Sequence, residues 1–171
     1  ATSSNTGLIP NPTVTYFSPN TTGTLTFTPV ANASGGATIT VVVNDGQATL
    51  SRSFTVTVNA ANDTPTLDAL SNLTLNEDAP AQSVNLSGIG TGAANESQTL
   101  TVTAVSSNPG LFPDPTVSYS SPDTAGSLTL TPVAEASGTA TITVTVNDGE
   151  VQNNTFSRSF TVTVNPVNDP P

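Results

Sequence analysis

The sequence ATITVVVNDGQ at residues 37–47 returns almost unchanged as ATITVTVNDGE at residues 140–150. In both copies apolar residues alternate with threonine, which is the pattern of a β-strand that buries one of its two faces. The Asn-Asp-Gly near the end of each copy is typical of a hairpin turn. The chain is therefore predicted to form the same strand and turn twice, as parts of an internal repeat.

The similarity extends well beyond these two strands. Residues 1–47 align without a gap on residues 104–150. Residues 54–65 align on residues 160–171 once three extra residues, Val151 to Asn153, are allowed in the second copy. Sequences that repeat at a long fixed period are typical of arrays in which every unit performs the same structural task.

The repeat also predicts the domain organisation. Residues 66–103 have no counterpart before Ala1, so the first copy lacks the start of the repeat. We therefore expect residues 1–65 to form the C-terminal part of one repeat and residues 66–171 to form a complete one. A complete repeat of about 100 residues is long enough to bury a core of its own.

Seven strands are predicted within the complete repeat. Stretches with alternating apolar residues are separated by clusters of Gly, Pro, Asn and Asp, and no stretch shows apolar residues at helical spacing. The predicted strands centre on Leu73, Val84, Val102, Val117, Leu128, Ile142 and Val162. The expected fold is all-β, with β-sandwich modules of about seven strands, of which the first module is incomplete.

The composition excludes several classes of function. The chain has 2 Lys+Arg against 12 Asp+Glu, and nucleic-acid binding needs clustered cations. It has no His, Cys or Lys, so the usual general bases and activated nucleophiles of enzymes are missing. With only 8% charged residues, the surface must consist largely of Thr, Ser and Asn, which favours a secreted or cell-surface protein. No apolar stretch of about 18 residues and no signal peptide lie in this window.

Three motifs resemble those of bacterial cadherin-like and Ig-like tandem repeats, which occur in large surface proteins and adhesins. The motifs are Asn76-Glu77-Asp78, Asn147-Asp148-Gly149 and the sequence VNPVNDPP at residues 164–171. The resemblance covers essentially the whole chain. It implies tandem Ig-like or cadherin-like β-sandwich modules outside the cell, with calcium ions that stiffen the junctions between modules.

The resemblance also implies a set of calcium ligands. One junction would combine Asn62 and Asp63 of the linker with Asp148 of the following module, and oxygen ligands of this kind suit Ca²⁺. The sequence GAANES at residues 92–97 departs from the family, which has an acidic pair there. As an alternative, Asp and Asn in turns bond to their own backbone and need no ion. The candidate ligands are Asp45, Asn62, Asp63, Glu77, Asp78, Glu135, Asp148, Asn168 and Asp169.

These observations predict a non-enzymatic structural repeat of a long extracellular protein, such as a stalk, an adhesin shaft or a fibre. The expected partners are neighbouring modules of the same or an adjacent chain, which would supply the strands that the first module lacks. An alternative is a β-sandwich module that binds carbohydrate or ice. That alternative requires a cluster of exposed aromatic residues or a flat, regular array of threonine hydroxyls.

Overall fold

The computed structural model describes residues 1–168 and divides the chain into two compact units, Ala1–Ala61 and Asn62–Pro171. The described residues form twelve strands and no helix, which confirms the predicted all-β fold. Accordingly, this part of the chain has no helix that is long and apolar enough to cross a membrane. The boundary between the units falls slightly before the one that the repeat alignment predicts, because Asn62 and Asp63 bond to residues of the second unit.

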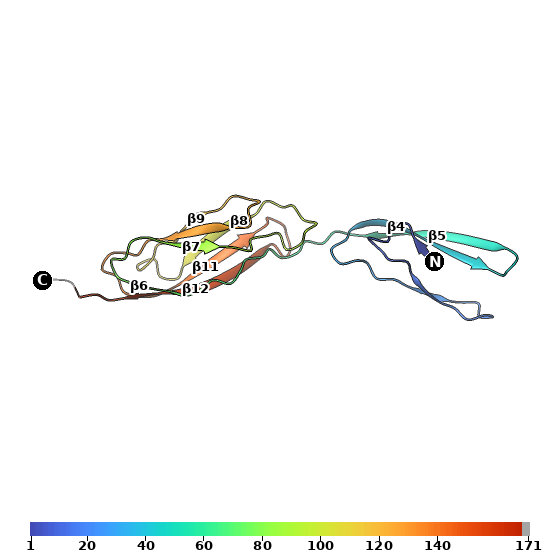
Figure 1. Cartoon of the computed structure of the whole chain (residues 1–171), viewed down its shortest axis with the longest axis horizontal. Coiled ribbons are helices and arrows are strands. Elements are labelled where there is room, and N and C mark those ends of the chain that lie inside the picture. Colours follow the sequence, from blue (N-terminus) through green and yellow to red (C-terminus); the bar gives the residue numbers. More distant parts are fainter. Residues whose placement is uncertain (169–171) are drawn as a thin grey trace. The chain divides into compact units, whose positions relative to one another are not determined.

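The second unit is a sandwich of two sheets (Figure 1). One sheet has the order β6-β12-β11-β8 and the other has the order β7-β10-β9. All neighbouring strands are antiparallel except β6 and β12, which run parallel. All seven predicted strands are confirmed: β6 (Leu73–Asn76), β7 (Gln82–Leu86), β8 (Thr101–Ser106), β9 (Thr116–Ser118), β10 (Gly126–Leu130), β11 (Gly138–Asn147) and β12 (Thr155–Asn165).

A single hydrophobic core fills the second unit. Apolar residues of both sheets point inward and threonines point outward, as the alternation of the sequence requires. Phe112, which lies outside the strands, joins this core with an exposed fraction of 0%. The buried strand residues of this core are Leu86, Leu128, Leu130, Ala140, Ile142, Val144, Val146, Phe160, Val162 and Val164. Two mainly antiparallel sheets around one such core are the architecture of Ig-like domains.

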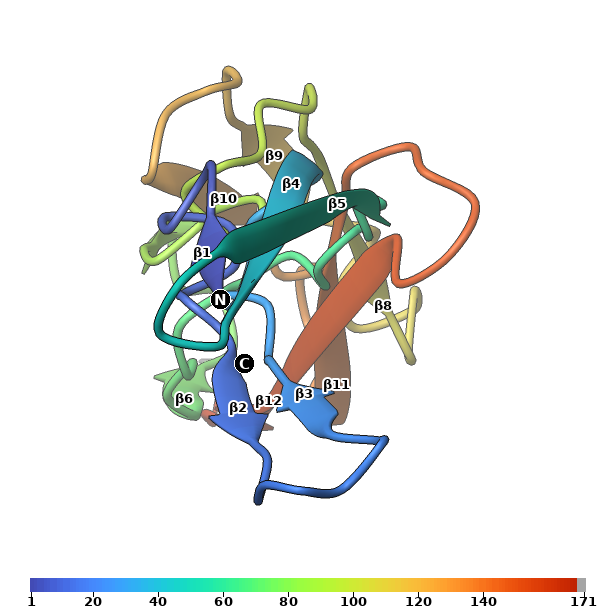
Figure 2. The same cartoon turned by 90° about the vertical axis from the view of Figure 1, so that its right-hand side faces the viewer.

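The first unit contains five described strands in two small sheets (Figure 2). The sheet β1-β4-β5 holds the long hairpin, and β2 pairs with β3 alone. Four residues form the buried core of this unit: Leu8, Ile9, Ala37 and Ile39. The strands are β1 (Thr2–Ser3), β2 (Thr13–Thr15), β3 (Thr24–Thr26), β4 (Gly35–Asn44) and β5 (Thr49–Val58).

Equivalent residues of the two repeats differ sharply in burial. Val43 is 63% exposed, whereas its counterpart Val146 is 0% exposed. Phe54 is 43% exposed, whereas its counterpart Phe160 is 3% exposed. In the second unit these positions share a core with Leu67, Leu86, Ile89 and Leu100 of the segment 66–103, which has no equivalent in the first unit. The described part of the first unit therefore has an open apolar face.

Candidate functional sites

The linker asparagine Asn62 is held by residues of the second unit. Its side-chain Nδ2 donates to Asp148 Oδ2 and to the Gln152 carbonyl, both at 2.9 Å. Its Oδ1 accepts from Gln98 Nε2 at 2.8 Å, and its backbone carbonyl accepts from Asn153 Nδ2 at 2.9 Å. We call these five residues, Asn62, Gln98, Asp148, Gln152 and Asn153, the linker clasp. The clasp brings together two of the residues that were predicted to meet at the junction.

The Asp148 carboxylate is well suited to hold an amide. Asp148 is only 5% exposed, and it is the one buried charged residue in the described part of the chain. Its Oδ1 accepts from the Glu150 backbone N–H at 2.9 Å, which leaves Oδ2 for Asn62. Hydrogen bonds to a charged acceptor at such a buried position are stronger than those between neutral groups.

The next linker residue, Asp63, lies against the loop that precedes β8. Its backbone N–H donates to Glu96 Oε1 at 2.8 Å. Gly92 in the same loop has φ of +102°, and a Cβ there would come within 2.4 Å of the Thr64 carbonyl oxygen. Glycine is thus required both for its backbone conformation and for the close approach of the linker.

Two oxygen atoms at this end of the unit have no hydrogen-bond partner among the described residues. They are Glu96 Oε2 and Gln98 Oε1, and both atoms are buried. Because a buried acceptor without a donor is costly, these oxygens would suit a cation that prefers oxygen ligands. The sequence did not point to Glu96 or Gln98 as ligands, since the segment 92–97 departs from the family pattern. Their position just before a predicted strand was the one sequence feature that could have indicated them as candidate ligands.

The candidate ligands do not form a ready-made metal cluster. In residues 1–168, no three His, Cys, Asp or Glu side chains gather in a way that could hold a metal ion. A calcium ion beside the clasp would therefore need amide or backbone oxygens in addition to the Glu96 carboxylate. Calcium accepts such mixed oxygen ligands.

The other predicted ligands lie elsewhere in the second unit. Glu77 follows β6, where its backbone N–H donates to the Asn165 carbonyl at 2.9 Å and its Oε1 accepts from the Val167 N–H at 2.5 Å. Asp78 and Glu135 both have positive φ, and the Glu135 N–H donates to Asp78 Oδ1 at 3.4 Å. Glu77 thus ties the exit of the chain to the first strand of the unit.

The remaining candidates belong to the turn of the first unit and to the end of the chain. Asp45 is exposed, and its Oδ1 accepts from the backbone N–H groups of Ala48 and Gln47 at 2.7 and 2.9 Å. These bonds, with that of Ala48 the larger cause, lower the pKa of Asp45 below its ordinary value, so they favour the charged carboxylate. Asn168 is exposed, and Asp169 lies outside the described residues.

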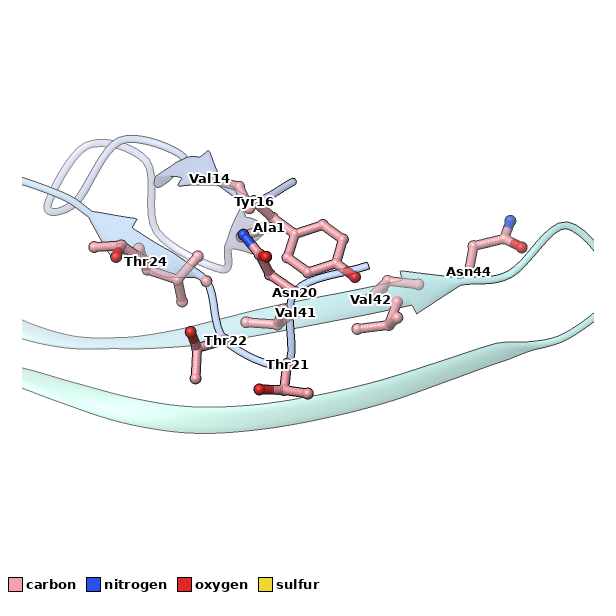
Figure 3. A pocket seen from close by; sticks show the side chains of 13 residues that line it. Ala1, Val14, Tyr16, Asn20, Thr21, Thr22, Thr24, Val41, Val42 and Asn44 are labelled. Atoms are coloured by element: carbon pink, nitrogen blue, oxygen red, sulfur yellow. The ribbon is translucent and has the colours of Figure 1, made fainter. Parts of the chain in front are cut away.

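The open face of the first unit forms a groove of about 630 Å³ (Figure 3). Val14 and Tyr16 line it from one side, and Val41 and Val43 line it from β4. Tyr16 is 51% exposed and Val14 is 48% exposed, so both apolar side chains are in contact with water. An apolar groove beside unpaired strand edges is suited to accept an added strand.

Several outward threonines share hydrogen bonds with serines of the neighbouring strand. Thr143 and Ser159 share a hydrogen bond of 3.0 Å, and Thr145 and Ser157 share one of 2.7 Å. In the first unit, Thr40 and Ser53 are joined in the same way at 2.9 Å. Because these hydroxyls bond to each other, they hold neighbouring strands of the sheets together.

Similar folds occur among solved structures. Domains 4 and 5 of the S-layer protein SbsC match with a TM-score of 0.43 and 20% identity, covering 80% of this chain and 67% of that one. Mouse clustered PcdhgC3 EC1-3 matches with a TM-score of 0.46 and 20% identity over 79% of this chain and 44% of that one. Titin domains Z1Z2 match with a TM-score of 0.42 and 13% identity over 93% and 74%.

The chain spans about a fifth of the longer SbsC structures that it also matches, with 19% and 20% of their lengths covered. No protein-family model matches the chain, and no curated protein sequence matches it. What the chain does must therefore be inferred from its own residues.

Proposed function

We propose that the chain is a non-enzymatic, load-bearing repeat of a long extracellular surface or filament protein. The observation that carries this proposal is the parallel pairing of the first and last strands of the second unit. Leu73 lies opposite Val162, and the pairing continues to Asn76 opposite Asn165. The chain enters this unit before β6 and leaves it after β12, so these two strands receive any force that the neighbouring modules apply.

The direction of the two strands determines how force acts on them. Pulling the ends of the unit apart draws β6 and β12 past each other along their length, because they run parallel. All hydrogen bonds between them are then loaded together and cannot open one at a time. Three further bonds lengthen this contact: Thr161 N–H to Asn72 Oδ1 at 2.8 Å, Glu77 N–H to the Asn165 carbonyl at 2.9 Å, and Val167 N–H to Glu77 Oε1 at 2.5 Å.

Single-molecule stretching of the whole chain tests this function. We expect the second unit to unfold in one step, at a higher force than the first unit. Replacing Glu77 by alanine removes a hydrogen bond to a charged group, worth about 1 to 2 kcal/mol, so the second unit should unfold roughly tenfold faster at a given force. Glu150→Ala, at an exposed acidic residue, is the matched control. Unfolding of the second unit by successive small steps would contradict the proposal.

The same proposal gives calcium a place at the clasp. The residues that would hold the ion are Glu96, through Oε2, and Gln98, through the amide oxygen Oε1. The support for this placement is that both oxygens are buried and have no hydrogen-bond partner among the described residues. When bound, the ion would neutralise the Glu96 carboxylate, whose Oε1 already holds the linker at Asp63.

Calcium should raise the melting temperature of the second unit. For a dissociation constant of about 10⁻³ M, about 10 mM Ca²⁺ adds roughly 1.4 kcal/mol, or about 5 °C or more. Calorimetry with Ca²⁺ or with a chelator measures this shift. Glu96→Gln should reduce it, whereas Glu150→Gln should not. Equal melting temperatures with calcium and with chelator would contradict the proposal that calcium binds and stabilises this unit.

The partners in this proposal are strands from neighbouring modules of the array. In the second unit, β7 pairs with β10 and β6 pairs with β12. The equivalent edges of β3 and β5 in the first unit have no such partners among the described residues. We propose that a segment like residues 66–103 of this repeat, supplied by a neighbouring module, pairs there and covers the groove.

A further inference from the structure

Two of the three residues by which the second repeat exceeds the first belong to the clasp. The three extra residues are Val151 to Asn153, in the loop between β11 and β12. Three of the five hydrogen bonds that hold Asn62 involve this insertion. Asn62 Nδ2 donates to the carbonyls of Gln152 and Asn153, and the Asn62 carbonyl accepts from Asn153 Nδ2. The position and the length of the insertion thus coincide with a contact to the linker.

The corresponding turn of the first repeat closes on itself. Asn44 Oδ1 accepts from the Gly46 N–H at 2.7 Å, and Asp45 Oδ1 accepts from Gln47 and Ala48. The second repeat begins in the same way, since Asn147 Oδ1 accepts from the Gly149 N–H at 2.6 Å. After this shared start the second loop extends to meet Asn62, whereas the first returns directly to β5.

The clasp suits the amide side chain of asparagine. An amide offers two N–H donors and an acceptor oxygen, and the clasp provides acceptors for the N–H groups and one donor for the oxygen. Aspartate at this position would set a second carboxylate against Asp148. Alanine would leave the buried Asp148 Oδ2 without its donor, which is costly.

We propose that the insertion, together with Gln98 and Asp148, is a receptor for the asparagine of the preceding linker. A repeat that carries the insertion fixes an Asn-Asp linker to its own surface, and a repeat without it leaves that linker free. The length of this one loop then sets which junctions of an array are stiff. The inference depends on the repeat and its hydrogen bonds, so it holds whether or not calcium binds and whether or not the array bears load.

The mobility of the linker in the whole chain tests the receptor. In ¹⁵N relaxation measurements with a chelator present, the amide of Asn62 should be as rigid as the strands of the second unit, with an order parameter of about 0.85. Asn62→Ala, and separately deletion of residues 151–153, should each lower the order parameters of residues 62 and 63 below about 0.6. Asn95→Ala, at an exposed residue in a loop of the second unit, is the control and should change neither value.

Combining the two changes sharpens the test. In the chain without residues 151–153, Asn62→Ala should have a smaller effect than in the unaltered chain, because the deletion already removes part of the receptor. The amide signals of Val144 and Val162 report whether the core stays folded. If the deletion unfolds the unit, the order parameters of Asn62→Ala and Asn153→Ala test the proposal without it. The proposal would be overturned if the backbone amide of residue 62 stayed rigid after these changes, or if that of Asn62 were already mobile in the unaltered chain.

Discussion

Val146→Asp is expected to unfold the second unit, whereas the same change at the equivalent Val43 should leave the stability of the first unit almost unaltered. Val146 is 0% exposed and Val43 is 63% exposed. At position 146 the change loses the burial of a valine, about 1.5 to 3 kcal/mol, and buries an unpaired carboxylate as well. We expect a loss of about 4 kcal/mol or more there, and of less than about 0.5 kcal/mol at position 43.

Denaturant unfolding of the whole chain measures both effects. Circular dichroism follows the loss of β-structure, and amide NMR signals assign each transition to its unit. The two valines follow nearly the same sequence, so a difference between them reports their surroundings and not the local preference for a strand. An equal loss at both positions would mean that the groove of the first unit is already covered in solution.

Adding a second copy of residues 66–103 in front of Ala1 stabilises the first unit. In the second unit this segment contributes four fully buried apolar side chains: Leu67, Leu86, Ile89 and Leu100. Each fully buried side chain of this kind is worth about 1.5 to 3 kcal/mol, and the ordering of the segment offsets part of that gain. We expect a net gain of roughly 3 kcal/mol, measured as a shift of the first unfolding transition.

The added copy should also change the response of Val43. Once the groove is covered, Val43→Asp should destabilise the first unit as much as Val146→Asp destabilises the second. The effects of the added copy and of Val43→Asp on the free energy of unfolding are therefore strongly non-additive. A copy in which Leu86 and Ile89 are replaced by aspartate is the matched control. It should not stabilise the first unit, and it should not slow the hydrogen exchange of the Val43 backbone amide. An unchanged first transition with the intact copy would contradict strand completion.

Most of the fold could be predicted from local sequence. The seven strands of the second unit follow from the alternation of apolar residues with threonine, because in a strand successive side chains point to opposite faces. Even the short strand β9 (Thr116–Ser118) lies where Val117 indicated it. The turns after β4 and β11 follow from Asn-Asp-Gly, whose asparagine side chains bond to the glycine N–H groups.

The candidate site could be predicted only in part. The pairing of Asn62 with Asp148 follows from the family resemblance, and the structure joins them by a hydrogen bond of 2.9 Å. Gln98 and Asn153 were not predicted, because each bonds to the linker from a different loop and neither belongs to a motif. Glu77 bonds to the exit of its own unit, and whether it also meets an ion is still a prediction.

Period-two alternation and a repeated sequence were sufficient to specify an all-β chain built from two copies of one repeat. They could not specify which apolar residues are buried, since Val43 and Val146 follow nearly identical sequences and have opposite environments. Burial at these positions depends on a segment far away in the chain, and the grip on Asn62 depends on two loops that meet only after the sheets have packed. Local preference fixes the direction in which a side chain points, whereas long-range packing fixes what it meets there.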